Sequence, residues 1–398
     1  MLGKFLTVSK TLPKDAKVAA LVGRVDRPGL GPSVVRVNPD ATLTDITAAY
    51  PTVSRLCNEP DPASSLRAAQ GEGIGELAAV LQSTLAGTGA LLLAPIDLQT
   101  VKAAGVTFPI SMIERMIEEA LRGDMSNSSK RSEVIGKIRD SVGSISALTP
   151  ATPEALKLLQ YLTDVNGLNL SATYPQVGLG EKAEIFTKQA VPLASVGHGA
   201  EAGFNTDSKW TNPEPELVSV INLRGQIVGA TLGNDVNDRY LEGLSALLLG
   251  VAKDRRGSST VGPFIRLFDD AFTLDTIRNI RVNLCVSGTD GFHEDGVNSM
   301  ADIRRDPQDV LAKQLFEIHD YPDGVVLFNG TGIVPNSDRN GPGSGSGFFH
   351  KTGDRVCIFA DELGSLANLM VPTGEVRMHE HSLFDFMTAL ARRGVLKV

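Results

Sequence analysis

Three acidic residues of this sequence are spaced so that a single β-hairpin would bring them together: Glu214, Glu216 and Asp235. Residues two apart in an extended strand point to the same face, so Glu214 and Glu216 share one face. Apolar, β-branched runs flank Arg224-Gly225, which is therefore the expected turn. A hairpin closed there places Asp235 opposite Glu214, with Cβ atoms roughly 4.5–5.5 Å apart.

Three converging carboxylates raise one another's pKa and destabilise a fold unless a positive charge neutralises them. Their oxygen-only donor set suits a hard divalent cation, Mg²⁺ first and then Mn²⁺ or Ca²⁺. The competing interpretation is a solvated acidic strand face, which a lone Glu-x-Glu pair would favour. Because the return strand delivers a third acid to the same point, we favour a metal site.

Two further segments carry candidate chemistry. Lys253 follows a predicted helix at 240–251, where it could reach a metal-bound substrate as cation or base, or simply favour the helix dipole. Its spacing alone favours the dipole role. Gly330-Thr331-Gly332 follows an apolar strand and is equally compatible with close ligand approach and with a plain turn. The glycine-rich run 341–347 lacks the Lys-Ser/Thr ending of a phosphate-binding loop.

The elements that must position these residues belong to an ordinary globular chain. The 398 residues are 42% hydrophobic and 21% charged, and a net charge of −8 argues against a nucleic-acid partner. The three cysteines show neither a disulfide framework nor zinc spacing. No apolar stretch reaches the ~20 residues of a membrane helix, and the N-terminus lacks a signal-peptide core. We therefore expect a soluble, cytoplasmic protein with no membrane partner.

The pattern of elements predicts an α+β fold with two domains. Residues 1–95 read as a small mixed module, with a helix expected at 74–85. Residues 96–398 form a β-rich catalytic body, interrupted by a helical insertion at about 124–170 that includes helices at 133–142 and 153–165. A helix at 111–123 is expected to begin on Ser111 as N-cap, with Glu114 completing a capping box.

With these motifs in place, the chain resembles the fumarylacetoacetate hydrolase superfamily over roughly residues 95–398. The motifs that carry the resemblance are Glu214-Pro215-Glu216-Leu217-Val218, the run from Ile227 to Val236, Lys253 ahead of Gly262-Pro263-Phe264, and Gly330-Thr331. The resemblance implies a β-rich fold and Mg²⁺ held by Glu214, Glu216 and Asp235. It also implies small-molecule 2-oxo acid substrates and a homodimer or homotetramer.

One departure from the family pattern separates two branches. Hydrolases of the superfamily carry Tyr-x-x-His-x-x-Glu, whose histidine and glutamate activate water. Here Ser111 stands in place of the histidine, while Glu114 keeps the acid. The pattern Gly-Val-Thr-Phe-x-x-Ser-x-x-x-Arg at 105–115 instead resembles the branch that dehydrates 2-keto-3-deoxy sugar acids, as does the N-terminal segment 21–26.

The reaction we expect is therefore dehydration of a 2-keto-3-deoxy-pentonate to 2,5-dioxopentanoate by a metal-dependent hydro-lyase. Lys253 is the favoured base and Glu114 the acid, with Ser111 as a further catalytic candidate. Thr331 with Gly330 would hold the substrate carboxylate, and Arg115 is a weaker candidate for that task. The alternatives are a 2,4-diketo acid hydrolase, an oxaloacetate-type decarboxylase, and a binding protein whose metal is structural.

Overall fold

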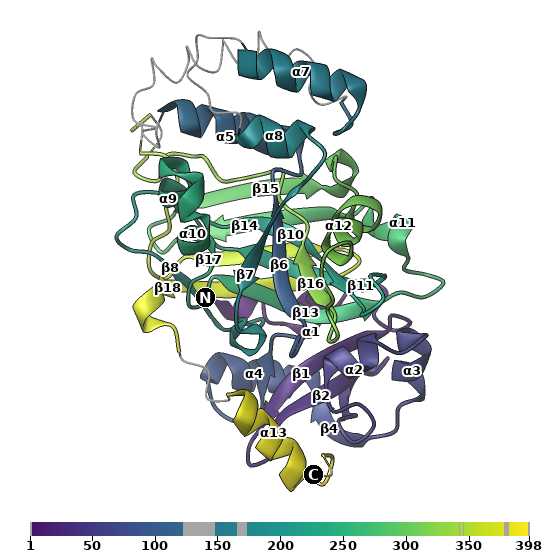
Figure 1. Cartoon of the computed structure of the whole chain (residues 1–398). Coiled ribbons are helices and arrows are strands. Elements are labelled where there is room, and N and C mark those ends of the chain that lie inside the picture. The colour runs from purple at the N-terminus through teal and green to yellow at the C-terminus, as the bar shows by residue number, and fades with distance from the viewer. Residues whose placement is uncertain are drawn as a thin grey trace.

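The computed structural model describes residues 2–121, 148–164, 173–341, 343–344, 346–377 and 382–396. This part of the chain has the α+β class expected from the sequence. Two β-sheets form its middle, with helices α5, α7 and α8 gathered at one end and the N-terminal strands with α13 at the other (Figure 1). Within the same ranges, no helix combines the length and apolarity needed to cross a bilayer.

A large sheet of eleven strands carries the hairpin predicted from the sequence. In spatial order its strands are β4 (Glu72–Glu76), β3 (Thr42–Asp45), β2 (Gly31–Val37), β1 (Leu21–Arg27), β13 (Ser259–Leu267), β11 (Ile227–Asp235), β10 (Pro215–Ile221), β16 (Val325–Phe328), β6 (Thr100–Gly105) and β7 (Glu184–Gln189), while β5 (Leu91–Leu93) pairs with β1. Because β1 pairs with β13, the N-terminal strands continue the same sheet. A domain boundary at 95 stays a prediction.

A second sheet packs against the large one. Its strands, in spatial order, are β15 (His293–Ser299), β14 (Arg281–Ser287), β17 (Arg355–Ala360), β18 (Gly364–Pro372) and β8 (Glu201–Phe204). A separate short pair joins β9 (Thr211–Asn212) to β12 (Asn237–Asp238). Buried apolar side chains from both sheets, such as Leu232 and Val286, form one core between them. The large sheet is therefore covered on this face.

Strand β10 is buried along its whole length because both of its faces are covered. Leu217 and Ile221 point into the core shared with the second sheet. Val218 and Val220 point the other way and pack in a second core with Val53 of α2 (Val53–Cys57). Since Glu214 and Glu216 have the same parity as Val218, they lie on the face away from the second sheet.

Helices of the described ranges lie around the sheets. Besides α2 they are α1 (Val8–Thr11), α3 (Pro62–Ala68), α4 (Leu77–Ala86), α5 (Pro109–Leu121), α7 (Pro153–Asp164), α8 (Thr173–Leu179), α9 (Arg239–Leu244), α10 (Leu249–Lys253), α11 (Leu274–Ile277), α12 (Lys313–Phe316), preceded by a π-helical turn at Pro307–Ala312, and α13 (Leu383–Arg392). Met116 of α5, Ala155 of α7 and Tyr174 of α8 share one small core. The predicted helix at 133–142 lies outside the described residues.

Three helix predictions were wrong in detail. The segment before Leu77 is strand β4, paired with β3, so the helix expected at 74–85 starts late. The helix expected at 240–251 is broken at Ser245, which is extended and caps a following 3₁₀ turn with its hydroxyl. Ser111 is not an N-cap, because α5 already begins at Pro109, a residue whose fixed φ suits the first helical position.

Candidate active site

The β10–β11 hairpin has the register predicted from the sequence. Pro215 pairs with Asn234 and Glu216 with Gly233. The Asp235 amide donates a hydrogen bond to the Glu214 carbonyl over 3.0 Å, so these two residues lie side by side. An irregularity at the closed end of the hairpin shifts the register there, away from the acids.

The three acids converge in the interior. Glu214, Glu216 and Asp235 are 5%, 1% and 1% exposed, and one oxygen of each lies within 4.8 Å of the others. Burial raises the pKa of Glu216 well above its usual range, and the neighbouring Asp235 and Glu214 raise it further. A buried cluster of carboxylate oxygens needs a compensating cation. These residues therefore fit Mg²⁺ or a similar hard divalent ion.

Two buried lysines reach the same carboxylates. Lys253 Nζ lies 2.5 Å from Glu214 Oε2 and 3.1 Å from Asp235 Oδ2. Burial disfavours the Lys253 cation, but Asp235 and Glu214 outweigh burial and raise its pKa. Lys188 on β7, which sequence analysis missed, places Nζ 2.7 Å from Asp235 Oδ1 and donates to the carbonyls of Lys253 (2.5 Å) and Val236 (3.2 Å). The acidic cluster is thus held by protein cations in this geometry.

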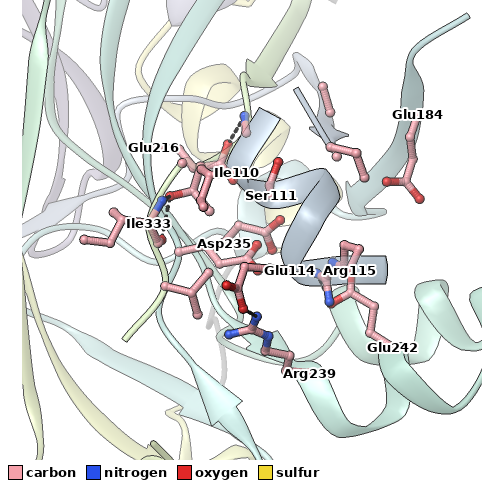
Figure 2. Close-up of a pocket in the computed structure, with 18 of the residues that line it drawn as sticks. Ile110, Ser111, Glu114, Arg115, Glu184, Glu216, Asp235, Arg239, Glu242 and Ile333 are labelled. Carbon is pink, nitrogen blue, oxygen red and sulfur yellow. Dashed lines mark hydrogen bonds and ion pairs between the residues drawn. The ribbon is translucent and has the colours of Figure 1, made fainter. Parts of the chain in front are cut away.

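Helix α5 lies beside the acids and carries three of the predicted site residues (Figure 2). Glu114 Oε2 lies 3.4 Å from an Arg239 guanidinium nitrogen. Arg115 forms an ion pair with Glu242 and lies 3.7 Å from Glu214 Oε1.

The third of these residues, Ser111, has its hydroxyl engaged within α5 itself. Ser111 Oγ donates to the Phe108 carbonyl over 2.7 Å. The structure therefore brings Ser111 into the cavity wall, with its proton turned towards the backbone of its own first turn.

The turn after β16, at Gly330-Thr331, contacts the acidic cluster through Glu216. The Gly330 amide donates a 2.6 Å hydrogen bond to Glu216 Oε2. Gly330 has φ +94°, and a Cβ there would lie 2.1 Å from Thr107 Oγ1, so this turn requires glycine. Thr331 also lines the cavity, and its hydroxyl donates to the Ile333 carbonyl over 2.8 Å. The glycine-threonine turn thus lines the same cavity as the three acids, and its contact with substrate stays a prediction.

A cavity of about 220 Å³ joins these groups. It is lined by all nine residues predicted from the sequence and by three charged residues that sequence analysis missed, Glu184, Arg239 and Glu242. Arg239 and Glu242 lie on α9, whose first turn follows directly after the β12 strand. The only sequence signal for Arg239 and Glu242 was that they follow closely after Asp235. Glu184 had no such signal, because β7 reaches the cavity only by pairing with β6.

The fold and this site agree with the class that the sequence resembles. A solved 2-keto-3-deoxyarabinonate dehydratase has a TM-score of 0.59 and 22% identity to this chain, covering 88% of this chain and 98% of its own. A 2-hydroxyhepta-2,4-diene-1,7-dioate isomerase from Mycobacterium marinum has a TM-score of 0.51 and 17% identity, covering 90% and 100%. The chain therefore shares the fold of these solved dehydratase and isomerase structures.

Two sequence relatives are both named as dehydratases of 2-keto-3-deoxy sugar acids. The chain is 35% identical over 173 residues to the 2-dehydro-3-deoxy-D-arabinonate dehydratase of Saccharolobus solfataricus, covering 42% of this chain and 54% of the relative. It is 30% identical over 190 residues to a probable 2-keto-3-deoxyxylonate dehydratase of Haloferax volcanii, covering 47% and 60%. The matches thus span little more than half of each relative, and no family model matches the chain. Sequence and fold together confirm the resemblance to the superfamily.

Proposed function

We propose that this protein is a Mg²⁺-dependent hydro-lyase that converts a 2-keto-3-deoxy-pentonate to 2,5-dioxopentanoate. The observation that carries the proposal is that the buried carboxylates of Glu214, Glu216 and Asp235 converge beside a cavity. Helix α5 lines this cavity and carries Ser111 at the position where the hydrolases have a water-activating histidine. The names of both sequence relatives support this substrate class. A structure with the same fold is a 2-keto-3-deoxy-D-arabinonate dehydratase complexed with magnesium and 2,5-dioxopentanoate.

Bound between the three carboxylates, Mg²⁺ would act as a Lewis acid towards the carboxylate and C2 keto oxygens of a 2-oxo acid, which favours loss of a C3 proton. Thr331, Gly330 and Arg115 line the cavity beside the acids and are proposed to orient the substrate carboxylate. Lys253 is proposed to take the C3 proton. In the geometry described above it is a cation between Glu214 and Asp235, so this role requires it first to lose its proton and release one of them.

Glu114 is proposed to serve the hydroxyl that leaves from C4. Its side chain is one-third exposed and lines the cavity, and its carboxylate forms an ion pair with Arg239. Ser111 positions the first turn of α5, since its hydroxyl is bound to the Phe108 carbonyl. A serine so engaged cannot replace the imidazole base that hydrolytic C–C cleavage needs. The geometry therefore favours elimination over hydrolysis.

The test is a substrate comparison with the purified protein. Protein loaded with Mg²⁺ is incubated separately with 2-keto-3-deoxy-arabinonate, 2-keto-3-deoxy-xylonate, a 2,4-diketo acid and oxaloacetate. We expect an aldehyde product from at least one of the sugar acids, and its loss after EDTA treatment. Pyruvate release from the diketo acid or from oxaloacetate, with no aldehyde from either sugar acid, would contradict the proposal.

A further inference from the structure

The hairpin of β14 and β15 carries a second group of metal-ligating side chains, on the face of the second sheet opposite the core. Cys285 of β14 pairs with Asp295 of β15, and His293 lies two residues before Asp295 on the same face. Leu284 and Val286, which alternate with Cys285, are buried in the core between the two sheets. Cys285, His293 and Asp295 therefore point outwards together.

The three side chains are close enough to hold one ion. One ligand atom of Cys285, His293 and Asp295 each lies within 4.8 Å of the others, and His293 Nε2 is 3.0 Å from Asp295 Oδ2. Bonds of about 2.0–2.3 Å around a tetrahedral Zn²⁺ keep neighbouring ligand atoms roughly 3.3–3.8 Å apart. Shifts of about 1 Å or less in these side chains would therefore close the group around a single zinc ion.

The donor types select a different metal from the acidic cluster of the cavity. A thiolate, an imidazole and a carboxylate suit Zn²⁺, whose sites with three protein ligands keep a fourth position for water. The oxygen-only donors of the cavity suit Mg²⁺ instead. The order of Cys285, His293 and Asp295 along the chain is not that of a zinc motif, because the ligands come from two strands and meet only in the register of the hairpin.

The surroundings of the group give an ion both access and charge balance. Cys285 is half-buried against the core of the N-terminal segment, whereas His293 and Asp295 are exposed, so an ion can reach all three from solvent. Burial and Asp295 raise the pKa of the Cys285 thiol, while Lys4 and Lys10 oppose them. A coordinating metal removes this proton. The thiolate and the Asp295 carboxylate then balance the two charges of the ion.

We propose that Cys285, His293 and Asp295 bind Zn²⁺ as a second metal site, with water completing a tetrahedral shell. The site is separate from the proposed hydro-lyase chemistry, since none of its three ligands lines the catalytic cavity. When the ion binds, the thiol proton passes to solvent, and sulfur, nitrogen and oxygen replace waters that the free ion held. No oxidant or reductant is needed, because Zn²⁺ keeps its charge.

The ion joins two strands that also support the active site. Asn298 of β15 points to the opposite face from Asp295 and is buried. Its side chain donates to the Gly330 carbonyl over 3.4 Å and accepts from the Gly332 amide over 2.9 Å. Zinc bound across β14 and β15 therefore stabilises the hairpin whose inner face holds the glycine-threonine turn of the cavity.

The experiment uses Co²⁺ as a visible substitute for Zn²⁺, with the full chain in excess Mg²⁺ and a thiol-free reductant. A thiolate bound to Co²⁺ gives a charge-transfer band in the near ultraviolet, which the oxygen-only acids of the cavity cannot produce. We expect the band to saturate at one equivalent of Co²⁺ and to fall when Zn²⁺ is added. Cys285→Ser should abolish it. Cys357→Ser is the matched control, because this buried thiol lies opposite Cys285 on β17 and outside the group.

Competition with a chelator then measures the other two ligands. Losing an outer-shell partner of a bound metal costs about 10–100-fold in affinity, so losing a direct ligand should cost at least as much. We expect losses of this size in Zn²⁺ affinity for His293→Ala and Asp295→Asn. His319→Ala, which removes an exposed histidine stacked on Tyr321, is the control and should bind like the wild type.

Thermal unfolding separates loss of the site from loss of the fold. All the variants should unfold at the wild-type temperature in EDTA, because the ligands lie on the sheet surface. Zn²⁺ should raise the Tm of the wild type in excess Mg²⁺ and leave that of Cys285→Ser unchanged. Absence of a thiolate band in the wild type, a band that persists in Cys285→Ser, or unchanged Zn²⁺ affinity in His293→Ala and Asp295→Asn would overturn the site.

Discussion

Replacing Lys188 by methionine should expose how the acidic cluster is stabilised. The ammonium of Lys188 is 0% exposed and lies 2.7 Å from Asp235 Oδ1, itself in a side chain 2% exposed. It also donates to the carbonyls of Val236 and Lys253. Methionine keeps the length of the side chain but leaves Asp235 without one of its two cations. Burial lowers the pKa of Lys188 while Asp235 opposes this, so the pair depends on mutual contact.

The magnitude follows from the burial of the pair. Removing one partner of a buried ion pair costs about 3–5 kcal/mol, because the other charge is left uncompensated. Asp235→Asn alone should also lower the free energy of unfolding, because it leaves the Lys188 cation without its partner. The double variant should be more stable than the sum of the two losses predicts, with an interaction energy towards the upper end of about 0.5–3 kcal/mol.

The assay is urea unfolding in EDTA and again in excess Mg²⁺. The control is Lys182→Met, which removes the exposed ion pair with Glu317 and should cost no more than about 1 kcal/mol. In Mg²⁺ the loss caused by Lys188→Met should shrink, since a second cation then compensates Asp235. Additive single losses within about 0.5 kcal/mol, or a loss equal to that of Lys182→Met, would refute the reasoning.

Three further outcomes are expected. Glu216→Gln should weaken Mg²⁺ binding about tenfold or more in titration calorimetry, yet leave the protein at least as stable in EDTA, because burial beside two other acids raises the pKa of Glu216; tight binding by the variant would contradict this. His198, whose pKa burial lowers to about 3, stays neutral in the folded state while the unfolded chain binds a proton below its usual pKa of about 6.5. Stability should therefore fall with decreasing pH, by about 2 kcal/mol between pH 8 and pH 5, and His198→Gln should flatten this slope in EDTA; an unchanged slope would contradict the assignment. Gly330→Ala should cost about 1–3 kcal/mol in urea unfolding, because of its positive φ and the contact with Thr107, and a neutral substitution would count against the role of this turn.

The convergence of the proposed metal-binding residues could be predicted because it depends on local geometry. Strand alternation and one turn place Glu214, Glu216 and Asp235 together, and the observed register agrees with that prediction. Even the irregularity at Val220–Ile221 leaves the acids in place, since it lies at the other end of the hairpin. The glycine-threonine turn was found from its position after an apolar strand.

Two of the charged groups near the acids, Lys188 and Glu184, could not be predicted, because long-range strand pairing brings them there. Lys188 and Glu184 lie on β7, which joins the sheet only through β6, and β6 itself pairs in parallel with β16. Neither residue stands in a motif that indicates burial. Ser111 illustrates a different limit. A serine followed three residues later by an acid resembles a capping box, but the preceding Pro109 had already started the helix.

A crystal of the protein grown with Mn²⁺ and measured for anomalous scattering tests the central claim most directly. We expect one ion bonded to an oxygen from each of Glu214, Glu216 and Asp235, at roughly 2.0–2.2 Å if it replaces Mg²⁺. Lys253 should then have moved away from at least one of its carboxylates. An anomalous peak elsewhere, with Lys253 still joined to Glu214 and Asp235 and no ion among the three acids, would contradict the claim.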